Sequence, residues 1–191
     1  MMNHKKNTIA VVFAGGKSSR MGKDKALLPF SDHTSLAEYQ YRRLSKLFDK
    51  VYISAKSDKF DFDVNIIVDC YEDSSPLVAL ISIFETLDVN EIFVLSVDAP
   101  FVGEEIIKKL YAEAKEDSVA IVAESNHGLE PLCGIYRRTI LKKAKEALSL
   151  NRHRLVSLLN EVGGQKIKID DTESFMNLNH PFEYEEAMIR I

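Results

Sequence analysis

The sequence predicts an α/β domain built as a doubly wound, mostly parallel sheet in three layers. Short apolar segments rich in β-branched residues alternate along the chain with longer segments of helical period. The apolar segments also lack polar alternation, which is typical of strands buried on both faces of a largely parallel sheet. Ligands of such sheets bind beyond the carboxyl ends of the strands. We therefore expect the chemistry in the loops that follow residues 13, 68 and 97.

Five segments are expected to form strands and three are expected to form helices between them. The strands are residues 8–13, 51–55, 64–68, 92–97 and 119–123. The helices are residues 34–48 behind a Thr34 or Ser35 cap, residues 76–87 with Pro76 at the first helical position, and residues 103–115. Their inward faces carry Leu36, Tyr39, Leu44 and Leu47 in the first helix and Ile106, Ile107, Leu110 and Tyr111 in the third. No repeat or proline-rich linker interrupts the pattern, so residues 1–191 are expected to form a single domain.

Composition excludes several classes of protein. The 191 residues are 46% hydrophobic and 28% charged, and the net charge of −4 argues against a general affinity for nucleic acid or anionic membranes. The longest apolar run, Ile9 to Ala14, is far shorter than the roughly 18 to 20 residues that span a bilayer. The basic residues before it imitate a signal peptide, but the run leads into GGKSSR rather than a cleavage site. We therefore expect this run to be the first buried strand.

Cysteine and histidine usage argues against a disulfide framework and a zinc site. Cys70 and Cys133 lie far apart, and the five histidines form no HExxH or paired pattern. A reducing cytoplasm is the natural location for such a chain.

A glycine-rich loop follows the first predicted strand. Residues 13–25 read FAGGKSSRMGKDK and carry three glycines and four basic residues. Glycines let successive backbone N–H groups converge on phosphate oxygens, while Arg20 and Lys25 neutralise the charge. The P-loop pattern GxxxxGK[ST] requires glycine at position 11, where the chain has Val11, and no GxGxxG pattern is present. The sequence thus predicts an anion-binding loop of neither of these two kinds.

The stretch AGGKSSRMGKDKALL resembles the signature of the molybdenum cofactor guanylyltransferase family, nucleotidyltransferases that activate a phosphorylated substrate with a nucleoside triphosphate. The resemblance implies a Rossmann-like nucleotidyltransferase domain, with an N-terminal part for GTP and Mg²⁺ and a C-terminal part on the pterin side. It implies catalytic roles for Arg20 and Lys25. The alternative is a glycine-rich turn with solvated charges. The matching positions are Gly15, Gly16, Ser18, Arg20, Met21, Gly22, Asp24 and Lys25, and the implied nucleotide contacts here are Phe13, Ala14, Gly15, Gly16 and Lys25.

Two aspartates follow predicted strands. The segment Val97-Asp98-Ala99-Pro100-Phe101 resembles the family's Asp-x-Pro-Phe element, which implies that Asp98 is a catalytic residue, a nucleotide contact and the magnesium ligand. Mg²⁺ commonly takes one or two carboxylates together with substrate phosphates. The same resemblance implies nucleotide contacts for Asp69 and Ser54. The alternatives are a turn-forming aspartate at position 98 and ordinary loop and strand-end residues at the other two positions.

Polar residues near the C-terminus resemble the family's acceptor side. Asn177-Leu178-Asn179-His180-Pro181 is similar to its Asn-x-Asn-x-Pro element, which implies that Asn177 and Asn179 face the pterin. In an extended segment, residues two apart point to the same side. The alternative is that Asn179 caps a helix beginning near Pro181. The basic tetrad at residues 151–154 corresponds to the family's pterin-side surface, with a solvated charge run as the alternative reading.

The chain departs from the family at the second helix. The family often has Gly-Pro-Leu-x-Gly there, whereas this chain reads Ser75-Pro76-Leu77-Val78-Ala79. Lys56 also stands where the family frequently has asparagine. The two glycines of the family's Gly-Pro-Leu-x-Gly element would allow close approach of a base. Their absence from this chain puts base specificity in doubt more than reaction type.

The implied reaction is attack by the terminal phosphate of molybdopterin, with or without its metal, on the α-phosphorus of GTP. Pyrophosphate leaves and a guanine dinucleotide cofactor forms. The implied partners are GTP, molybdopterin, and the molybdoenzymes or chaperones that receive the product. One alternative is a CTP-dependent transferase acting on molybdopterin or on a sugar or alcohol phosphate, although the Asp24-Lys25 pair favours the guanylyl branch. The alternative from another class is a nucleotide-sensing or partner-binding module, and Arg20, Lys25 and Asp98 count against it.

Overall fold

The computed structural model describes residues 8–15, 23–71, 73–171 and 173–191. In this part of the chain, seven strands form one sheet in the order β3-β2-β1-β4-β6-β5-β7. The strands are β1 (Ile9–Phe13), β2 (Lys50–Ala55), β3 (Ile66–Val68), β4 (Glu91–Ser96), β5 (Ala120–Ser125), β6 (Gly128–Arg137) and β7 (Gln165–Lys168). The α-helices are α1 (Leu36–Leu44), α2 (Pro76–Thr86), α3 (Glu104–Glu113), α4 (Leu141–Ser149), α5 (Leu155–Glu161) and α6 (Pro181–Ile189). The predicted α/β class is confirmed.

The sheet is parallel except at one strand. β6 runs antiparallel to both β4 and β5, while the other neighbouring pairs are parallel. Gly134 lies in β6 at a close approach to β5, because a Cβ there would come within 2.5 Å of the Ile121 carbonyl oxygen. The sequence patterns did not predict β6, β7, α4 or α5. β6 contains Pro131 and two glycines, residues that weaken a strand pattern, and β7 is short and polar.

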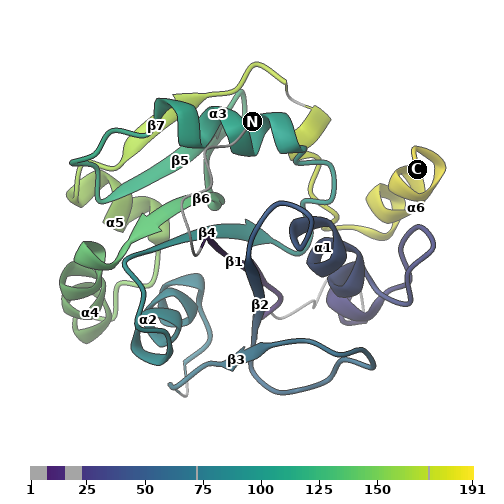
Figure 1. Cartoon of the computed structure of the whole chain (residues 1–191), viewed down its shortest axis with the longest axis horizontal. Coiled ribbons are helices and arrows are strands. Elements are labelled where there is room, and N and C mark those ends of the chain that lie inside the picture. The colour runs from purple at the N-terminus through teal and green to yellow at the C-terminus, as the bar shows by residue number, and fades with distance from the viewer. Residues whose placement is uncertain (1–7, 16–22, 72, 172) are drawn as a thin grey trace.

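The two faces of the sheet carry separate apolar cores. One core packs α1, α3 and α6 against the sheet, and the other packs α2, α4 and α5 against the opposite face. Figure 1 shows α2, α4 and α5 gathered on one side of the strands and α1 and α3 on the other. The expected three layers are therefore present.

The predicted helices form but are shorter than expected. The helix expected over residues 34–48 ends at Leu44, and Ser35 rather than Thr34 is its N-cap, accepting from the Glu38 N–H at 3.1 Å. Residues 45–47 continue as turns whose N–H groups bond back to the last helical carbonyls. Helices α2 and α3 likewise end one or two residues before the predicted limits of 87 and 115. The predicted strand at 64–68 shrinks to β3, which pairs with β2.

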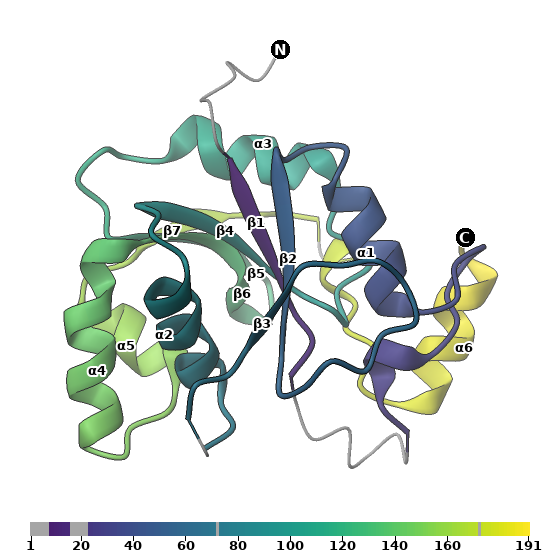
Figure 2. The same ribbon diagram turned by 60° about the horizontal axis from the view of Figure 1, so that its bottom comes forward.

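Chain topology places several loops side by side at one edge of the sheet. β1, β2 and β3 lie in successive positions, and β4 pairs with the other side of β1, so the chain reverses its winding direction between β1 and β4. Loops that leave the sheet at such a switch point diverge and open a crevice for ligands. The carboxyl ends of β1, β2, β3 and β4 therefore share one edge, as the ribbon in Figure 2 shows for β1 and β2.

The C-terminal segment returns to this edge. The Leu178 N–H donates to the Asp98 carbonyl at 2.9 Å, and the Tyr184 hydroxyl donates to the Pro29 carbonyl. The Tyr184 ring also lies 6.4 Å from that of Phe30. Figure 2 shows α6 beside α1, at the side of the molecule that carries the loop before α1. These contacts bring the segment 176–180 to the loop after β4.

Candidate active site

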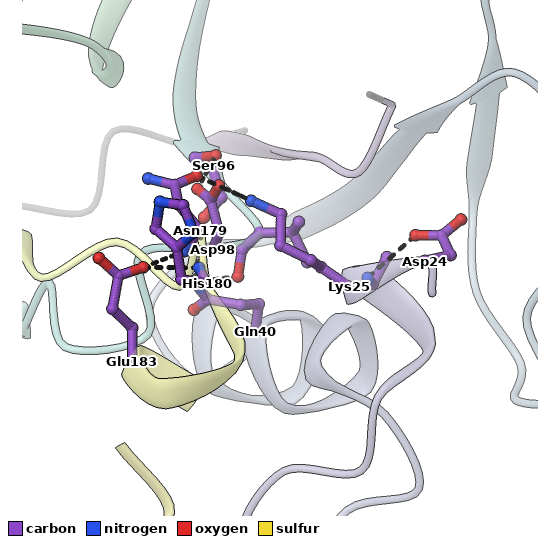
Figure 3. Close-up of polar contacts among 10 residues, drawn as sticks. Asp24, Lys25, Gln40, Ser96, Asp98, Asn179, His180 and Glu183 are labelled. Atoms are coloured by element: carbon purple, nitrogen blue, oxygen red, sulfur yellow. Dashed lines mark hydrogen bonds and ion pairs between the residues drawn. The ribbon is translucent and has the colours of Figure 1, made fainter. Parts of the chain in front are cut away.

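Four polar residues from three distant segments meet at the carboxyl end of β4 (Figure 3). Lys25 Nζ lies 2.5 Å from Asp98 Oδ2 and donates to Asn179 Oδ1 at 3.0 Å. Ser96 Oγ donates to the other carboxylate oxygen, Asp98 Oδ1, at 2.5 Å. The Lys25 and Asp98 side chains are only 15% and 18% exposed, so their attraction is weakly screened by solvent. A cation, a carboxylate and an amide are thus held in one cluster.

Lys25 is positioned by the turn that follows the glycine-rich loop. It begins the 3₁₀ helix η1 (Lys25–Leu27), which Asp24 caps by accepting from the Ala26 N–H at 3.1 Å. Asp24 also pairs with Lys59, whose Nζ donates to the Ala14 carbonyl at 3.3 Å. Lys59 therefore contacts the chain on both sides of the glycine-rich loop. Sequence reasoning missed this residue, and no motif marks it.

Asp98 is held through the backbone as well as through its side chain. Its carbonyl accepts from the Leu178 N–H, and the carbonyls of its neighbours accept from the side-chain amide of Gln40 on α1. Sequence reasoning also missed Gln40. A signal was present, because Gln40 stands on the same helical face as Leu36 and Leu44, where a polar residue interrupts an apolar stripe.

A second group of predicted nucleotide contacts lies across β1, β2 and β3. Ser54 Oγ donates to Asp69 Oδ1 at 3.4 Å, and the Ala14 N–H donates to the Ser54 carbonyl at 2.9 Å. Gly15 lies next to Asp69, since a Cβ on Gly15 would be 3.8 Å from Asp69 Oδ2. Partial burial raises the pKa of the Asp69 carboxyl, while the Ser54 hydrogen bond and the charge of Lys56 act in the opposite direction.

The predicted residues that the structure describes thus form two groups along one edge of the sheet. One group is Phe13, Ala14, Gly15, Ser54 and Asp69, and the other is Lys25, Asp98 and Asn179. Gly16 and Arg20, with the rest of residues 16–22, lie outside the described residues.

A pocket of about 480 Å³ adjoins the second group. Asn177 and Asn179 both line it, but the extended geometry expected for this segment is wrong. The Asn179 N–H donates to the Asn177 carbonyl at 3.0 Å, so the chain bends at the residue between them. The lining residues are His127, Glu130, Glu173, Phe175, Met176, Asn177, Asn179, Glu183 and Arg190.

Asn179 is not the N-cap of the last helix, an alternative that the sequence left open. His180 is the N-cap of α6, and Glu183 completes a capping box by accepting from the His180 N–H at 2.7 Å. The same Glu183 oxygen accepts from the Asn179 N–H at 2.6 Å. The Asn179 side chain is therefore directed to Lys25, while its backbone is held by α6 (Figure 3).

The basic tetrad at 151–154 is placed elsewhere. Arg152 pairs with Glu161 at 3.2 Å, and His153 Nδ1 lies 3.1 Å from Ser75 Oγ at the start of α2. None of these four residues is among those that line the described pocket. The structure therefore brings the tetrad to α2 and α5 and not to Asn177 and Asn179.

The departure from the family at α2 has a local explanation. Ser75 is the N-cap of α2, accepting from the Val78 N–H at 3.2 Å, and Pro76 follows it at the start of the helix as predicted. Ala79 is 7% exposed and belongs to the core against this face of the sheet. Helix capping and packing therefore account for both residues that stand where the family has glycine.

Within the described residues, the structure contains no helix long and apolar enough to cross a membrane and no group of three or more His, Cys, Asp or Glu that could hold a metal ion. Both cysteines are free thiols, Cys70 exposed and Cys133 buried.

Comparison with known proteins identifies the family. A family model described as "MobA-like NTP transferase domain" matches residues 10–166. The molybdenum cofactor guanylyltransferase of Campylobacter jejuni subsp. doylei is 36% identical over 178 residues, covering 92% of this chain and 93% of the relative. The protein of the same name from Helicobacter pylori G27 is 36% identical over 188 residues, covering 95% and 92%.

A solved structure shares the fold. Molybdopterin-guanine dinucleotide biosynthesis protein A from Archaeoglobus fulgidus superposes with a TM-score of 0.82 at 19% identity, covering 96% of this chain and 98% of that one. The family model and the curated relatives confirm the resemblance carried by the glycine-rich loop and the Asp-x-Pro-Phe element. The chain therefore belongs to the MobA-like NTP transferase family and is a nucleotidyltransferase.

Proposed function

We propose that the protein transfers GMP from GTP to the molybdopterin cofactor, with or without its metal, forming molybdopterin guanine dinucleotide and pyrophosphate. One observation carries the proposal beyond the names of the relatives. Asn179 accepts a hydrogen bond from Lys25, the last residue of the glycine-rich segment 13–25, and also lines the 480 Å³ pocket, so one cluster joins the predicted nucleotide side to a cavity. A group transfer between two bound substrates needs two such adjoining sites.

The nucleotide is proposed to lie over β1, β2 and β3. Its base and ribose face Ser54 and Asp69, and its phosphates face the glycine-rich loop, where Arg20 and Lys25 supply positive charge. Gly15 lies next to Asp69, which supports a path for the nucleotide along this edge.

The proposed chemistry is an in-line displacement at phosphorus. A terminal phosphate oxygen of the acceptor forms the new bond to the α-phosphorus of GTP, and the bond between the α-phosphorus and the bridging oxygen of pyrophosphate breaks. The nucleophile is already an anion, so no activated serine, cysteine or histidine is required. Lys25 and Arg20 would stabilise charge on the departing pyrophosphate, and the two adjoining sites would align the reacting atoms.

Asp98 is proposed to hold Mg²⁺. Its two carboxylate oxygens are hard ligands at the end of β4, and a single carboxylate supplemented by triphosphate oxygens suits Mg²⁺. The metal would neutralise phosphate charge in the transition state. Asp98 itself is oriented by Ser96 and Lys25.

The 480 Å³ pocket is proposed to receive the pterin. Asn177 and Asn179 offer amide donors and acceptors, and the carboxylates of Glu130, Glu173 and Glu183 can accept from the N–H groups of a heterocycle. Asn177→Ala is the cleaner test, because Asn179 also contacts Lys25. We expect this variant to raise the KM for molybdopterin several-fold without changing the KM for GTP. An equal rise in both values would refute the assignment.

The whole chain, residues 1–191, is proposed to act as a single domain in the cytoplasm, where its two free thiols stay reduced. Molybdoenzymes or their chaperones are the proposed recipients of the product.

The first test is a thermal shift with Mg²⁺ and, separately, GTP, CTP, ATP and UTP. A ligand at 100 times its Kd adds about 2.7 kcal/mol of stability, which raises the midpoint by roughly 5 to 10 °C for a chain of this size. We expect selective stabilisation by GTP that is lost in Lys25→Ala, followed by pyrophosphate release that requires both GTP and molybdopterin. Preference for CTP would instead identify a cytidylyltransferase. Nucleotide binding without pyrophosphate release would indicate a sensor.

A further inference from the structure

We infer that Gln40 is a positioning residue: its side-chain amide, oriented by Arg43, fixes the loop that carries Asp98 and thereby sets the affinity of the site for a divalent metal. This inference rests on the proposed function, which makes Asp98 the metal ligand. It concerns two residues of α1 that no motif marks.

The Gln40 amide contacts the backbone on both sides of Asp98. Its Nε2 lies 3.1 Å from the Ser96 carbonyl oxygen, 3.4 Å from that of Val97 and 3.0 Å from that of Ala99. Gln40 is completely buried, so these carbonyls replace water as its hydrogen-bond partners. The strand end and the turn after it are therefore tied to α1 through one NH₂ group (Figure 3).

Arg43 determines which way this amide faces. Its Nη2 donates to Gln40 Oε1 at 2.5 Å, and its Nη1 donates to the Val102 carbonyl. A guanidinium group can only donate hydrogen bonds, so the amide oxygen must face Arg43 and the NH₂ must face the loop. Arg43 thus also ties the far end of the loop, at residue 102, to the same helix.

Packing alone does not require the Gln40 amide and the Arg43 guanidinium at these positions. Leu36 and Leu44 are fully buried on the same face of α1, and a leucine at position 40 would continue the apolar stripe. Burial lowers the pKa of Arg43, which reflects the unfavourable desolvation of its charge. A buried amide and a largely buried cation are instead directed at the loop of the proposed metal ligand.

The consequence for Asp98 follows from its short connection to the anchored carbonyls. Ser96 and Ala99 are held on either side, and Ser96 Oγ in turn donates to the Asp98 carboxylate at 2.5 Å. Mg²⁺ demands near-ideal octahedral geometry, so a small displacement of its protein ligand weakens binding. Residues that orient metal ligands typically contribute 10- to 100-fold to metal affinity.

The test measures Mn²⁺ binding to the purified protein in the presence of a non-reactive GTP analogue, with free Mn²⁺ followed by electron paramagnetic resonance. Gln40→Met keeps the length and volume of the side chain but has no NH₂ to donate. We expect it to raise the Kd for Mn²⁺ roughly 10- to 100-fold. Gln40→Glu keeps the contact with Arg43 while placing a carboxylate against three carbonyls, and we expect at least the same loss.

Gln165 provides a matched control at the other end of the sheet. It begins β7, its Nε2 donates to the Glu113 carbonyl at 2.7 Å, and its Oε1 accepts from the Lys115 N–H at 3.0 Å. Gln165→Met therefore removes amide-to-backbone hydrogen bonds by the same substitution. We expect this variant to lose stability in urea unfolding while its Kd for Mn²⁺ stays at the wild-type value.

Each outcome bears on a different claim. Wild-type Mn²⁺ affinity in both Gln40 variants, together with weak binding in Asp98→Ala, would overturn the positioning role and leave the proposed function standing. Wild-type affinity in Asp98→Ala would overturn the metal assignment and the inference with it. Equal losses in Gln40→Met and Gln165→Met, or failure of both Gln40 variants to fold, would assign Gln40 to general stability and overturn the inference.

Discussion

Replacement of Lys25 by methionine separates the structural role of this residue from its proposed role in catalysis. The Lys25–Asp98 ion pair spans 2.5 Å between side chains that are 15% and 18% exposed, and Lys25 also donates to Asn179. Methionine keeps most of the side-chain volume but leaves the Asp98 carboxylate without this cation. The loss of a charge-assisted hydrogen bond of this kind destabilises the folded state by about 1.5 to 3 kcal/mol.

The expected loss of turnover exceeds what this loss of stability explains. A protein that is stable by about 5 to 15 kcal/mol remains largely folded after such a change. Removing one preorganised group that stabilises transition-state charge lowers turnover by about 10² to 10³, or roughly 2.7 to 4 kcal/mol. We therefore expect Lys25→Met to unfold at lower urea concentration and to release pyrophosphate at least a hundredfold more slowly, even when it is fully folded.

Both quantities are measured on the same preparations, by urea unfolding and by pyrophosphate release with GTP and molybdopterin. Lys145→Met is the matched control, because Lys145 pairs with Glu85 at 2.6 Å on the surface, where its side chain is 48% exposed. Exposed ion pairs contribute little to stability because solvent screens them. Turnover of Lys25→Met within twofold of that of Lys145→Met would refute the catalytic role.

Three other substitutions test separate parts of the site and fold. Asp98→Asn keeps the shape of the side chain but removes its negative charge. We expect turnover to fall at least a hundredfold and to recover partly at high Mg²⁺. A Mg²⁺ titration of pyrophosphate release measures both effects. Burial raises the pKa of the Asp69 carboxyl in the folded protein above its ordinary value of 3.8. Between pH 3.8 and the raised pKa, the unfolded chain loses this proton while the folded protein keeps it, so the free energy of unfolding falls as pH rises. Asp69→Asn should therefore become more stable relative to wild type as pH rises from 4 to 7, as measured by urea unfolding. The variant should also bind GTP more weakly in calorimetry. A difference in unfolding free energy between variant and wild type that stays constant from pH 4 to pH 7 would contradict the cause assigned to the pKa shift. Gly134→Ala would place a Cβ 2.5 Å from the Ile121 carbonyl oxygen. We expect the unfolding free energy to fall by about 1 to 3 kcal/mol. An unfolding free energy equal to that of wild type would show that the sheet relaxes there without strain.

The sequence alone predicted much of the edge of the sheet on which the site lies. Strands such as β1 and β4 were predictable because each is a short apolar run buried on both faces, and their order along the chain implies parallel packing. The family followed from a resemblance to its signature, which is carried by two contiguous motifs, the glycine-rich loop and the Asp-x-Pro-Phe element. The site residues proposed from those motifs remain predictions, and Arg20 lies outside the described residues.

Local patterns could not predict β6, the antiparallel strand of the sheet. β6 contains Pro131 and Gly134, which weaken a strand pattern, but it is held between β4 and β5 by pairing on both sides. Its register is set by those partners rather than by its own residues. Tertiary pairing therefore overrides a weak local preference, as is general for β-strands.

The sequence by itself determined the fold class, the family and the loops in which to look for chemistry, because these depend on periodicity and on motifs within a few consecutive residues. Only the tertiary structure decided which side chains meet. Lys25 contacts Asn179 across 154 positions of sequence. Gln40 interrupts the apolar stripe of its helix, but the pattern does not indicate that its partner is the Asp98 loop. Such contacts depend on how elements are brought together in space, and no local pattern encodes them.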